Sequence, residues 1–387
     1  MLLALTEAEA AHSAALRRRI TQHIEAAGGF INFETFMNLA LYAPGLGYYS
    51  AGSAKIGAAG DFTTAPEVSA LFGRCVAAQC AQLLRALPRG HILELGAGSA
   101  SMADVVLREL AALDALPTHY DILEISADLA ERQYRRLAGL PEHLRSRVRW
   151  LQQLPAMPFS GVILANEVLD ALPCRRFVAR ADGVEELGVA VALDGALTWA
   201  ARPPDTALLA AVEQLNAALP APLAPGYASE LCLLVEPWIA SLAAVLKHGA
   251  ILLFDYGLPR SQYYHPERSS GTLTCHFKQR AHFDPLMNVG VQDISAWVDF
   301  TRVALAGQAA DLEVLGFCTQ AGFLLGAGIE DLLAQPRDTV EQARLSGEAQ
   351  RLLLPGEMGE AFKLLALGRG IEVPLQSFRL QELSPSL

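Results

Sequence analysis

The stretch Ile92-Leu93-Glu94-Leu95-Gly96-Ala97-Gly98-Ser99-Ala100 predicts the fold of the chain around it. A short apolar run contains an acid, a Gly-x-Gly turn follows, and a helix is expected through Met102–Leu110. A strand, a tight turn and a helix N-terminus bring bare backbone close to a nucleotide-like ligand. Gly96 and Gly98 permit this close approach because a side chain there would occupy ligand space. Ordinary strand-to-helix turns also use glycines, so this segment alone leaves its function open.

The residue after this stretch narrows the choice of ligand. A dinucleotide site normally carries a third glycine, in the pattern G-x-G-x-x-G, where helix and strand pack beneath a pyrophosphate. Ser101 occupies that position here. The turn therefore fits an adenosyl ligand without a pyrophosphate, which favours S-adenosylmethionine over NAD or FAD.

A second acidic residue is expected beside this turn. His119–Ile125 has the pattern of a strand, and Ser126 has the position of the N-cap of a helix that runs to Leu137. Glu124 would then lie near the carboxyl end of the neighbouring strand, where an acid can accept both hydroxyls of a ribose. The alternative is that Glu124 is a solvated charge at a strand end.

A group of polar residues follows another predicted strand. Gly161–Ala165 is uniformly apolar, as in a parallel strand buried on both faces, and Asn166, Glu167 and Asp170 come directly after it. Open α/β sheets bind ligands at the carboxyl ends of their strands. Buried acids there need cationic or hydrogen-bonding partners. The alternative is that both acids occupy a helix N-terminus, which favours negative charge.

The order of apolar runs predicts an α/β fold with a doubly wound, mostly parallel sheet. We divide the chain into an N-terminal helical region with a Gly-rich lid (1–87), a first part of the core (88–174), an antiparallel β insertion (175–230) and a second part of the core (231–387). Asp182-Gly183 and Asp194-Gly195 are strong hairpin signals within the insertion. The last part contains a substrate-side insertion (258–305) and a closing pair of strands at 311–319 and 361–367.

The composition limits the possible partners. The chain of 387 residues is 52% hydrophobic and has a formal net charge of −11, from 30 basic and 41 acidic residues. No nucleic acid partner is expected, because phosphate binding needs clustered Lys and Arg and the one basic run, Arg17-Arg18-Arg19, fits the solvated face of a helix. The start has no secretory or transit signal, and the apolar stretch Trp238–Phe254 is too interrupted to span a membrane. We therefore expect a cytoplasmic protein and leave its oligomeric state open.

Two further segments carry residues with possible chemistry. Paired glycines and aromatics over 42–50 and 60–67 suggest a lid that orders over a ligand, although an ordinary surface loop would look similar. Cys275, His276 and His282 suggest zinc, but no second Cys or His pair has ligand spacing, so no metal is expected. The six cysteines form no C-x-x-C pair and fit small buried hydrophobes.

Taken together, these segments resemble the MidA-type family of S-adenosylmethionine-dependent methyltransferases over most of residues 30–305. The motifs that carry the resemblance are Tyr42-Ala-Pro-Gly-Leu-Gly-Tyr-Tyr-Ser50, Gly60-Asp-Phe-Thr-Thr-Ala-Pro-Glu67, Glu94-Leu-Gly-Ala-Gly98, Ala165-Asn-Glu-Val-Leu-Asp-Ala-Leu-Pro173, Phe254-Asp-Tyr-Gly257 and Gln292-Asp-Ile-Ser-Ala-Trp-Val-Asp-Phe300. The resemblance implies a class I methyltransferase fold, Rossmann-like with a seven-stranded sheet. Mitochondrial members of this family methylate an arginine on a subunit of respiratory complex I and assist its assembly, so a protein substrate of this kind is implied.

Placement and resemblance together give a candidate set of site residues. Contacts to S-adenosyl-L-methionine are assigned to Glu94, Gly96, Gly98, Glu124, Ser126, Asn166, Asp61 and Thr63. Catalysis is assigned to Glu167, Asn166 and Asp170. Substrate contacts are assigned to Tyr48, Tyr49, Asp255, Tyr256, His276 and His282. Trp297 stands where the family leads us to expect a histidine, and Gln279 and Phe283 replace expected polar residues, which leaves the methylated protein open.

The expected reaction is an SN2 methyl transfer from the sulfonium to a guanidinium nitrogen. Carboxylates in a dry site can hold a guanidinium bidentately and aim one nitrogen at the methyl group. Glu167, supported by Asp170 or Asp61, is expected to do this. The alternatives are methyl transfer to a small molecule and an assembly chaperone that binds the adenosyl ligand without turnover.

Overall fold

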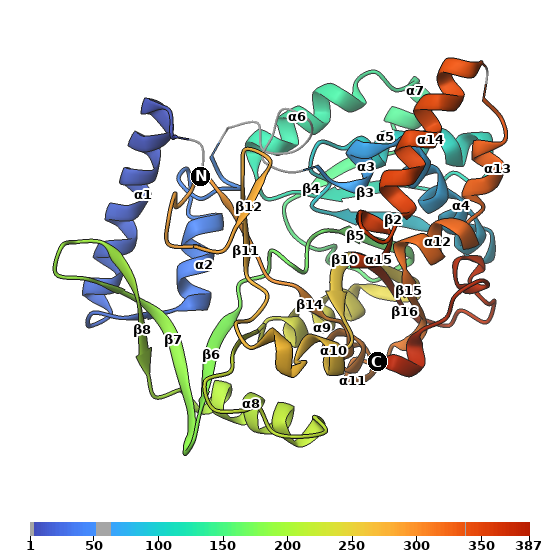
Figure 1. Cartoon of the computed structure of the whole chain (residues 1–387). Coiled ribbons are helices and arrows are strands. Elements are labelled where there is room, and N and C mark those ends of the chain that lie inside the picture. The colour runs from blue at the N-terminus through green and yellow to red at the C-terminus, as the bar shows by residue number, and fades with distance from the viewer. Residues whose placement is uncertain (1–3, 52–62, 337) are drawn as a thin grey trace.

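The computed structural model describes residues 4–51, 63–336 and 338–387. Its central sheet has the strand order β15-β16-β10-β5-β2-β3-β4, with the short β14 beside β10 (Figure 1). These strands are β2 (His91–Leu95), β3 (Tyr120–Leu123), β4 (Val148–Leu151), β5 (Phe159–Asn166), β10 (Leu246–Leu258), β14 (Val298–Asp299), β15 (Glu313–Thr319) and β16 (Phe362–Arg369). The sheet is parallel from β10 to β4, and β16 is antiparallel to both of its neighbours. The predicted α/β methyltransferase fold is confirmed, with the expected seven strands along the main path.

Helices cover both faces of this sheet because successive strand residues alternate between two apolar cores. Ile92 belongs to one core with helices α4, α5, α12 and α14, and Leu93 belongs to the other with α9 and α11. The helices of the core region are α3 (Ala65–Val68), α4 (Ala70–Ala86), α5 (Ser101–Ala112), α6 (Ala127–Leu137), α7 (Glu142–Arg145), α9 (Val235–Val245), α10 (Arg260–Tyr263), α11 (Phe300–Ala309), α12 (Gln320–Gly326), α13 (Ile329–Leu333), α14 (Thr339–Leu353) and α15 (Met358–Ala361). Short 3₁₀ turns lie at Pro266–Arg268, Gln376–Phe378 and Ser384–Ser386.

A second, antiparallel sheet lies beside the core, on the left in Figure 1. It consists of β1 (Ile31–Asn32), β6 (Arg175–Arg180), β7 (Gly183–Val191), β8 (Leu197–Arg202) and β9 (Ala228–Leu231), and α8 (Thr206–Ala218) follows β8. Helices α1 (Glu7–Ala26) and α2 (Phe33–Tyr42) pack against this sheet, and β1 pairs with β7. The N-terminal helices and the insertion therefore share one core. The sequence did not indicate that packing.

A third sheet is built from the predicted substrate-side insertion. Its strands are β11 (Thr274–Phe277), β12 (Arg280–His282) and β13 (Asp293–Ser295). It packs with α2 in the same core as the insertion sheet. Among the helices in the described parts of the chain, none is both long and apolar enough to cross a membrane.

Candidate active site

The glycine turn after β2 has the conformation that its glycines allow. Gly96, Gly98 and Ala100 all have positive φ, at 60°, 54° and 61°, and α5 begins at the next residue. A Cβ at position 96 would lie 3.4 Å from Val168 Cγ2, so the turn runs close beneath the segment after β5. The hydroxyl of Ser101 donates to the carbonyl of Pro66 at 3.0 Å. Ser101, which stands in place of a third glycine, thus links the start of α5 to Pro66 in α3.

Glu124 lies at the end of β3, as predicted, and is buried. Its carboxylate accepts hydrogen bonds from the Ser126 amide and from Gln133 Nε2, both at 2.8 Å. Gln133 also donates to the carbonyl of Gly98 at 3.1 Å, so it joins the acid to the glycine turn. Burial raises the pKa of Glu124 above its ordinary value. Ser126 is the N-cap of α6, as predicted, and its hydroxyl accepts from the Leu129 amide.

A cavity of about 860 Å³ opens between these elements. Its lining comes from α2 and the loop after it, α3, the glycine turn and the start of α5, the ends of β3 and β5, the start of α6, and α9. The charged residues that line it, within the described parts of the chain, are all acidic: Glu67, Glu94, Glu124, Asp128 and Glu167. Such a wall favours a cationic ligand, and it offers no described basic side chain for a phosphate.

Glu94, on β2, is a buried residue in the wall of this cavity. It is 1% exposed and accepts a 2.8 Å hydrogen bond from the Tyr120 hydroxyl. Burial raises its pKa to about 7, although the tyrosine bond acts in the opposite direction. A carboxyl group that titrates near neutrality is sensitive to the charge of a ligand.

Glu167 follows β5 in a strained backbone conformation. Its φ is 54°, which is unusual for a residue other than glycine. Its Oε1 accepts from Asn166 Nδ2 at 3.1 Å, and both side chains line the cavity. Burial, followed by the nearby Asp170, raises the pKa of Glu167 to about 8.

Asp170 lies behind the cavity wall and does not line it. Its Oδ2 accepts a 2.6 Å hydrogen bond from the Tyr256 hydroxyl, and its buried Oδ1 has no hydrogen-bond partner among the residues that the structure describes. Burial raises the pKa of Asp170 to about 6. The segment 167–172 is a turn rather than a helix, so the alternative interpretation of the acids as a helix N-terminus is wrong.

Several predicted substrate and cofactor contacts are not among the lining residues of the cavity. Tyr49 lines it and donates to Asp293 Oδ1 at 2.9 Å, whereas the neighbouring Tyr48 is buried in the apolar core. Thr63 does not line the cavity, but Thr64 does. The remaining predicted contacts that are outside the lining are Asp255, Tyr256, His276 and His282. Asp61 lies outside the described residues.

Other lining residues were not identified from the sequence. Tyr42 lines the cavity and its hydroxyl donates to the carbonyl of Ala171 at 2.9 Å. Trp238 and Leu242 line it from α9. Tyr42 begins the glycine- and tyrosine-rich motif at 42–50, and that motif is the sequence signal for its place in the lining. The α9 residues carry no local signal, because their pattern is that of an ordinary amphipathic helix. No group of three His, Cys, Asp or Glu in the described parts of the chain could hold a metal ion.

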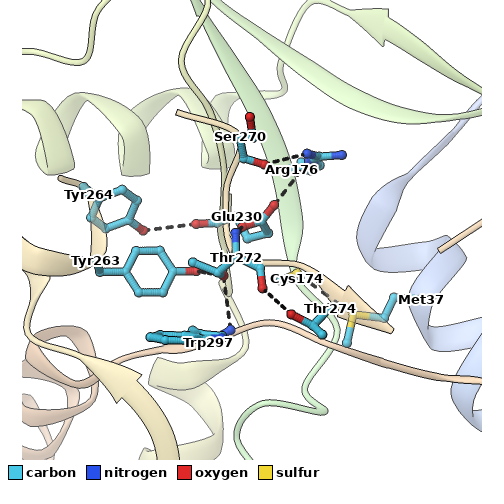
Figure 2. A network of polar contacts seen from close by, with 10 residues as sticks. All are labelled: Met37, Cys174, Arg176, Glu230, Tyr263, Tyr264, Ser270, Thr272, Thr274 and Trp297. Atoms are coloured by element: carbon cyan, nitrogen blue, oxygen red, sulfur yellow. Dashed lines mark hydrogen bonds and ion pairs between the residues drawn. The ribbon is translucent and has the colours of Figure 1, made fainter. Parts of the chain in front are cut away.

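Trp297 belongs to a buried polar network that joins the insertion sheet to residues 258–305 (Figure 2). At its centre, Glu230 accepts from the amide of Thr272 at 2.7 Å and pairs with Arg176 at 3.2 Å. The hydroxyl of Thr272 accepts from the Trp297 amide at 3.2 Å. The Trp297 ring meets the Tyr256 ring edge-on, and Tyr256 in turn bonds Asp170. The departure from the expected histidine therefore lies behind Asp170 and outside the cavity lining.

Comparisons with known proteins agree with this geometry. Residues 75–318 match the model of a family described as "Putative S-adenosyl-L-methionine-dependent methyltransferase". Over 389 residues the chain is 27% identical to "Protein arginine methyltransferase NDUFAF7, mitochondrial" of Danio rerio, covering 92% of this chain and 88% of that protein. The Homo sapiens protein of the same name is 26% identical, with 88% and 80% covered.

A solved structure resembles the whole chain. It is a "likely methyl transferase" from Burkholderia thailandensis bound to S-adenosyl-homocysteine, with 38% identity, a TM-score of 0.94 and complete coverage of both chains. A second structure from the same organism has 39% identity and a TM-score of 0.92. The expectation of a cytoplasmic protein is contradicted by these comparisons, since the curated relatives are named as mitochondrial.

Proposed function

Because the chain belongs to this family of S-adenosyl-L-methionine-dependent methyltransferases, we propose that it transfers the methyl group to a guanidinium nitrogen of a protein arginine. Its class of reaction and its cofactor follow from the family and from the neighbour that binds S-adenosyl-homocysteine. The name of the curated relatives, protein arginine methyltransferase, supports the choice of acceptor. The observation that carries the proposal is the carboxyl group of Glu167 in the wall of a cavity whose described charged lining residues are all acidic.

The described cavity suits S-adenosylmethionine. Gly96 and Gly98 leave room for backbone contact with the ligand, and Glu124 at the end of β3 can accept ribose hydroxyls. Glu94 can pair with the ammonium group of the methionine moiety. A volume of about 860 Å³ is large enough for the cofactor and the end of an acceptor side chain. When bound, the cofactor supplies an electrophilic methyl group on a positively charged sulfur, which becomes a neutral thioether.

Glu167 is placed to hold the acceptor. A guanidinium is a poor nucleophile because its charge and its nitrogen lone pairs are delocalised. A carboxylate that binds two of its N–H groups draws positive charge toward itself and fixes the plane of the group. The neighbouring Asn166 orients Oε1 of Glu167 through their 3.1 Å hydrogen bond. Tyr42 and Tyr49, stacked with centroids 5.6 Å apart, add an aromatic wall on which a cation can rest.

Glu167 also has the pKa needed to take up the proton that the methylated nitrogen loses. Burial raises this pKa to about 8. A guanidinium lowers that pKa by direct attraction, so binding ionises the carboxyl group. As the methyl group is transferred and positive charge leaves the sulfur, the carboxylate accepts the proton from the nitrogen. The products are then a neutral thioether, a methylguanidinium with one positive charge and a neutral carboxyl group, so the charges and the proton are all accounted for.

We extend the proposal to a subunit of respiratory complex I as the methylated protein. This extension rests on the resemblance seen in the sequence motifs. Asp170, behind Glu167, is proposed to add to the negative potential that attracts the guanidinium rather than to contact the cofactor, and its charge adds to burial in raising the pKa of Glu167.

Radiolabelled methyl transfer tests the proposal. The purified protein is incubated with S-adenosylmethionine labelled in the methyl group and with mitochondrial or bacterial complex I subunits, and the labelled protein is hydrolysed to amino acids. Label in methylated arginine supports the proposal. Label only in a small molecule or in another amino acid would refute it, as would tight cofactor binding with no transfer to any acceptor.

A further inference from the structure

The carboxylate of Asp255 lies directly beneath the turn that carries Glu167. Asp255 belongs to β10, which is adjacent to β5, and it is 1% exposed. It does not line the cavity. The sequence predicted a substrate contact for this residue, whereas within the described parts of the chain its hydrogen bonds come from backbone amides.

Asp255 accepts hydrogen bonds from consecutive amides of the site segment. Its Oδ2 accepts from the amides of Val168, Leu169 and Asp170 at 3.2, 2.9 and 3.2 Å. Its Oδ1 accepts from the Tyr256 amide at 2.9 Å. Amide donors that converge on one carboxylate form an anion-binding turn, and here the anion is a side chain of the same protein.

Glu167 depends on this turn for its orientation. Its own amide donates to the carbonyl of Phe254 at 2.8 Å, and the following amide is the first that Asp255 binds. Glu167, with its positive φ, thus lies between two hydrogen bonds to β10, one from its own amide and one from the amide of Val168. A residue in this conformation keeps it only when the surroundings enforce it. Without the carboxylate, the buried amides of 168–170 would lose their partner and the turn would rearrange.

We propose that Asp255 is a positioning residue, which fixes the strained turn so that Glu167 points into the cavity. This inference rests on the proposed role of Glu167. Burial and the nearby Asp170 raise the pKa of Asp255, and the backbone donors act in the opposite direction. Both oxygens already accept from N–H groups, so the ionised form is the one that these contacts satisfy.

Asp255→Asn separates this role from general stability. The single oxygen of the asparagine amide can still accept hydrogen bonds. Its NH₂ group would face either the Tyr256 amide or the amides of 168–170, so that two hydrogen-bond donors would oppose each other. We expect S-adenosylmethionine affinity within a few-fold of wild type and a fall in kcat of about 10²-fold, the cost of a misplaced reacting group. The remaining activity should also titrate at a different pH, because the environment of Glu167 changes.

Asp299→Asn is the matched control. Asp299, whose side chain is 9% exposed, accepts from the Arg302 amide at 3.1 Å as the N-cap of α11 and pairs with Arg260 at 3.3 Å, away from the cavity lining. It should lower stability without changing kcat per folded molecule or the pH profile. If Asp255→Asn behaves in the same way, Asp255 is only structural and the inference fails.

Amide hydrogen exchange provides a readout that does not depend on the acceptor. The amides of residues 168–170 should lose protection selectively in Asp255→Asn and keep it in Asp299→Asn. Unchanged protection in Asp255→Asn would overturn the positioning role. Failure of the wild-type protein to methylate any arginine would instead refute the proposed function and leave the exchange result standing.

Discussion

The hydroxyl of Tyr120 donates a 2.8 Å hydrogen bond to Oε2 of Glu94, and both residues are fully buried beside the cavity. Tyr120 is on β3 and Glu94 on β2, so the bond crosses two paired strands of the parallel sheet. It stabilises the ionised carboxylate in a place where burial disfavours charge. Burial raises the pKa of Glu94 and this hydrogen bond lowers it, and the result is a pKa of about 7. A small change in this pKa therefore changes the charge of the cofactor site at neutral pH.

Tyr120→Phe should therefore weaken S-adenosylmethionine binding in a pH-dependent way. Loss of the hydroxyl removes a hydrogen bond to a charged group, worth about 1.5–3 kcal/mol, so the pKa of Glu94 rises further. At neutral pH more of Glu94 is then protonated and cannot pair with the ammonium of the ligand. Calorimetry should show an affinity loss on the order of tenfold at neutral pH that recovers as the pH is raised.

Tyr263→Phe is a suitable control for this prediction. The Tyr263 hydroxyl is also buried, but it bonds Thr272 at 3.0 Å in the network of Figure 2, away from the cavity lining. Cofactor binding should be unchanged in this variant. Equal binding by Tyr120→Phe and wild type at every pH would show that Glu94 does not contact the ligand.

The stability of the ligand-free protein should fall as the pH rises from about 5 to about 8. Burial raises the pKa of Glu94 to about 7 and that of Glu167 to about 8, both from 4.5. A carboxyl group with a raised folded-state pKa contributes stability that is fully present below its unfolded pKa and is lost as the pH rises through the folded pKa. A tenfold change in proton affinity corresponds to about 1.4 kcal/mol, so the loss should reach a few kcal/mol. Urea unfolding across this window measures it, and a flat or rising free energy of unfolding would contradict the assignment.

Local signals in the sequence predicted much of this structure. Ser126 caps α6, as its position before an amphipathic run suggested. The signals at Asp182-Gly183 and Asp194-Gly195 correspond to the hairpins β6–β7 and β7–β8. The glycine turn lies between β2 and α5 with positive φ at both glycines. In each case the residues that determine the conformation are neighbours in the chain.

The failures concern partners that are far apart in the sequence. The sequence predicted a substrate contact for Asp255, whereas its carboxylate accepts from the amides of residues 168–170, which lie 85 to 87 residues earlier in the chain. Likewise, Ile31 pairs with Val189, which places the N-terminal helices on the insertion sheet. Helical periodicity identifies an apolar face without specifying what covers it. For the same reason the lining residue Trp238 could not be identified from its local sequence.

Tyr49→Phe should affect the acceptor more than the cofactor. The ring of Tyr49 lines the cavity and its hydroxyl donates to Asp293 Oδ1 at 2.9 Å. The variant keeps the aromatic wall but frees the ring to shift away from its place beside Tyr42. We expect KM for the protein substrate to rise several-fold, consistent with a hydrogen bond to a charged group, while the Kd for S-adenosylmethionine stays constant. A change in cofactor affinity alone would place Tyr49 on the cofactor side of the cavity instead.

Glu167→Gln should separate binding from transfer. The amide side chain preserves the shape of the site, so S-adenosylmethionine affinity should remain within a few-fold of wild type. It cannot draw positive charge from the guanidinium or accept its proton, so methyl transfer should fall by about 10²- to 10⁴-fold.

Glu124→Gln is the matched comparison, because the carboxylate of Glu124 lines the same cavity at the end of β3 and is proposed to bind ribose. That variant should lose cofactor affinity while bound cofactor still reacts at a near-normal rate. Both are measured by calorimetry and by single-turnover transfer of labelled methyl groups to the protein substrate. If Glu167→Gln transfers methyl groups as fast as wild type, the acceptor is bound by other residues and the catalytic role of Glu167 is wrong.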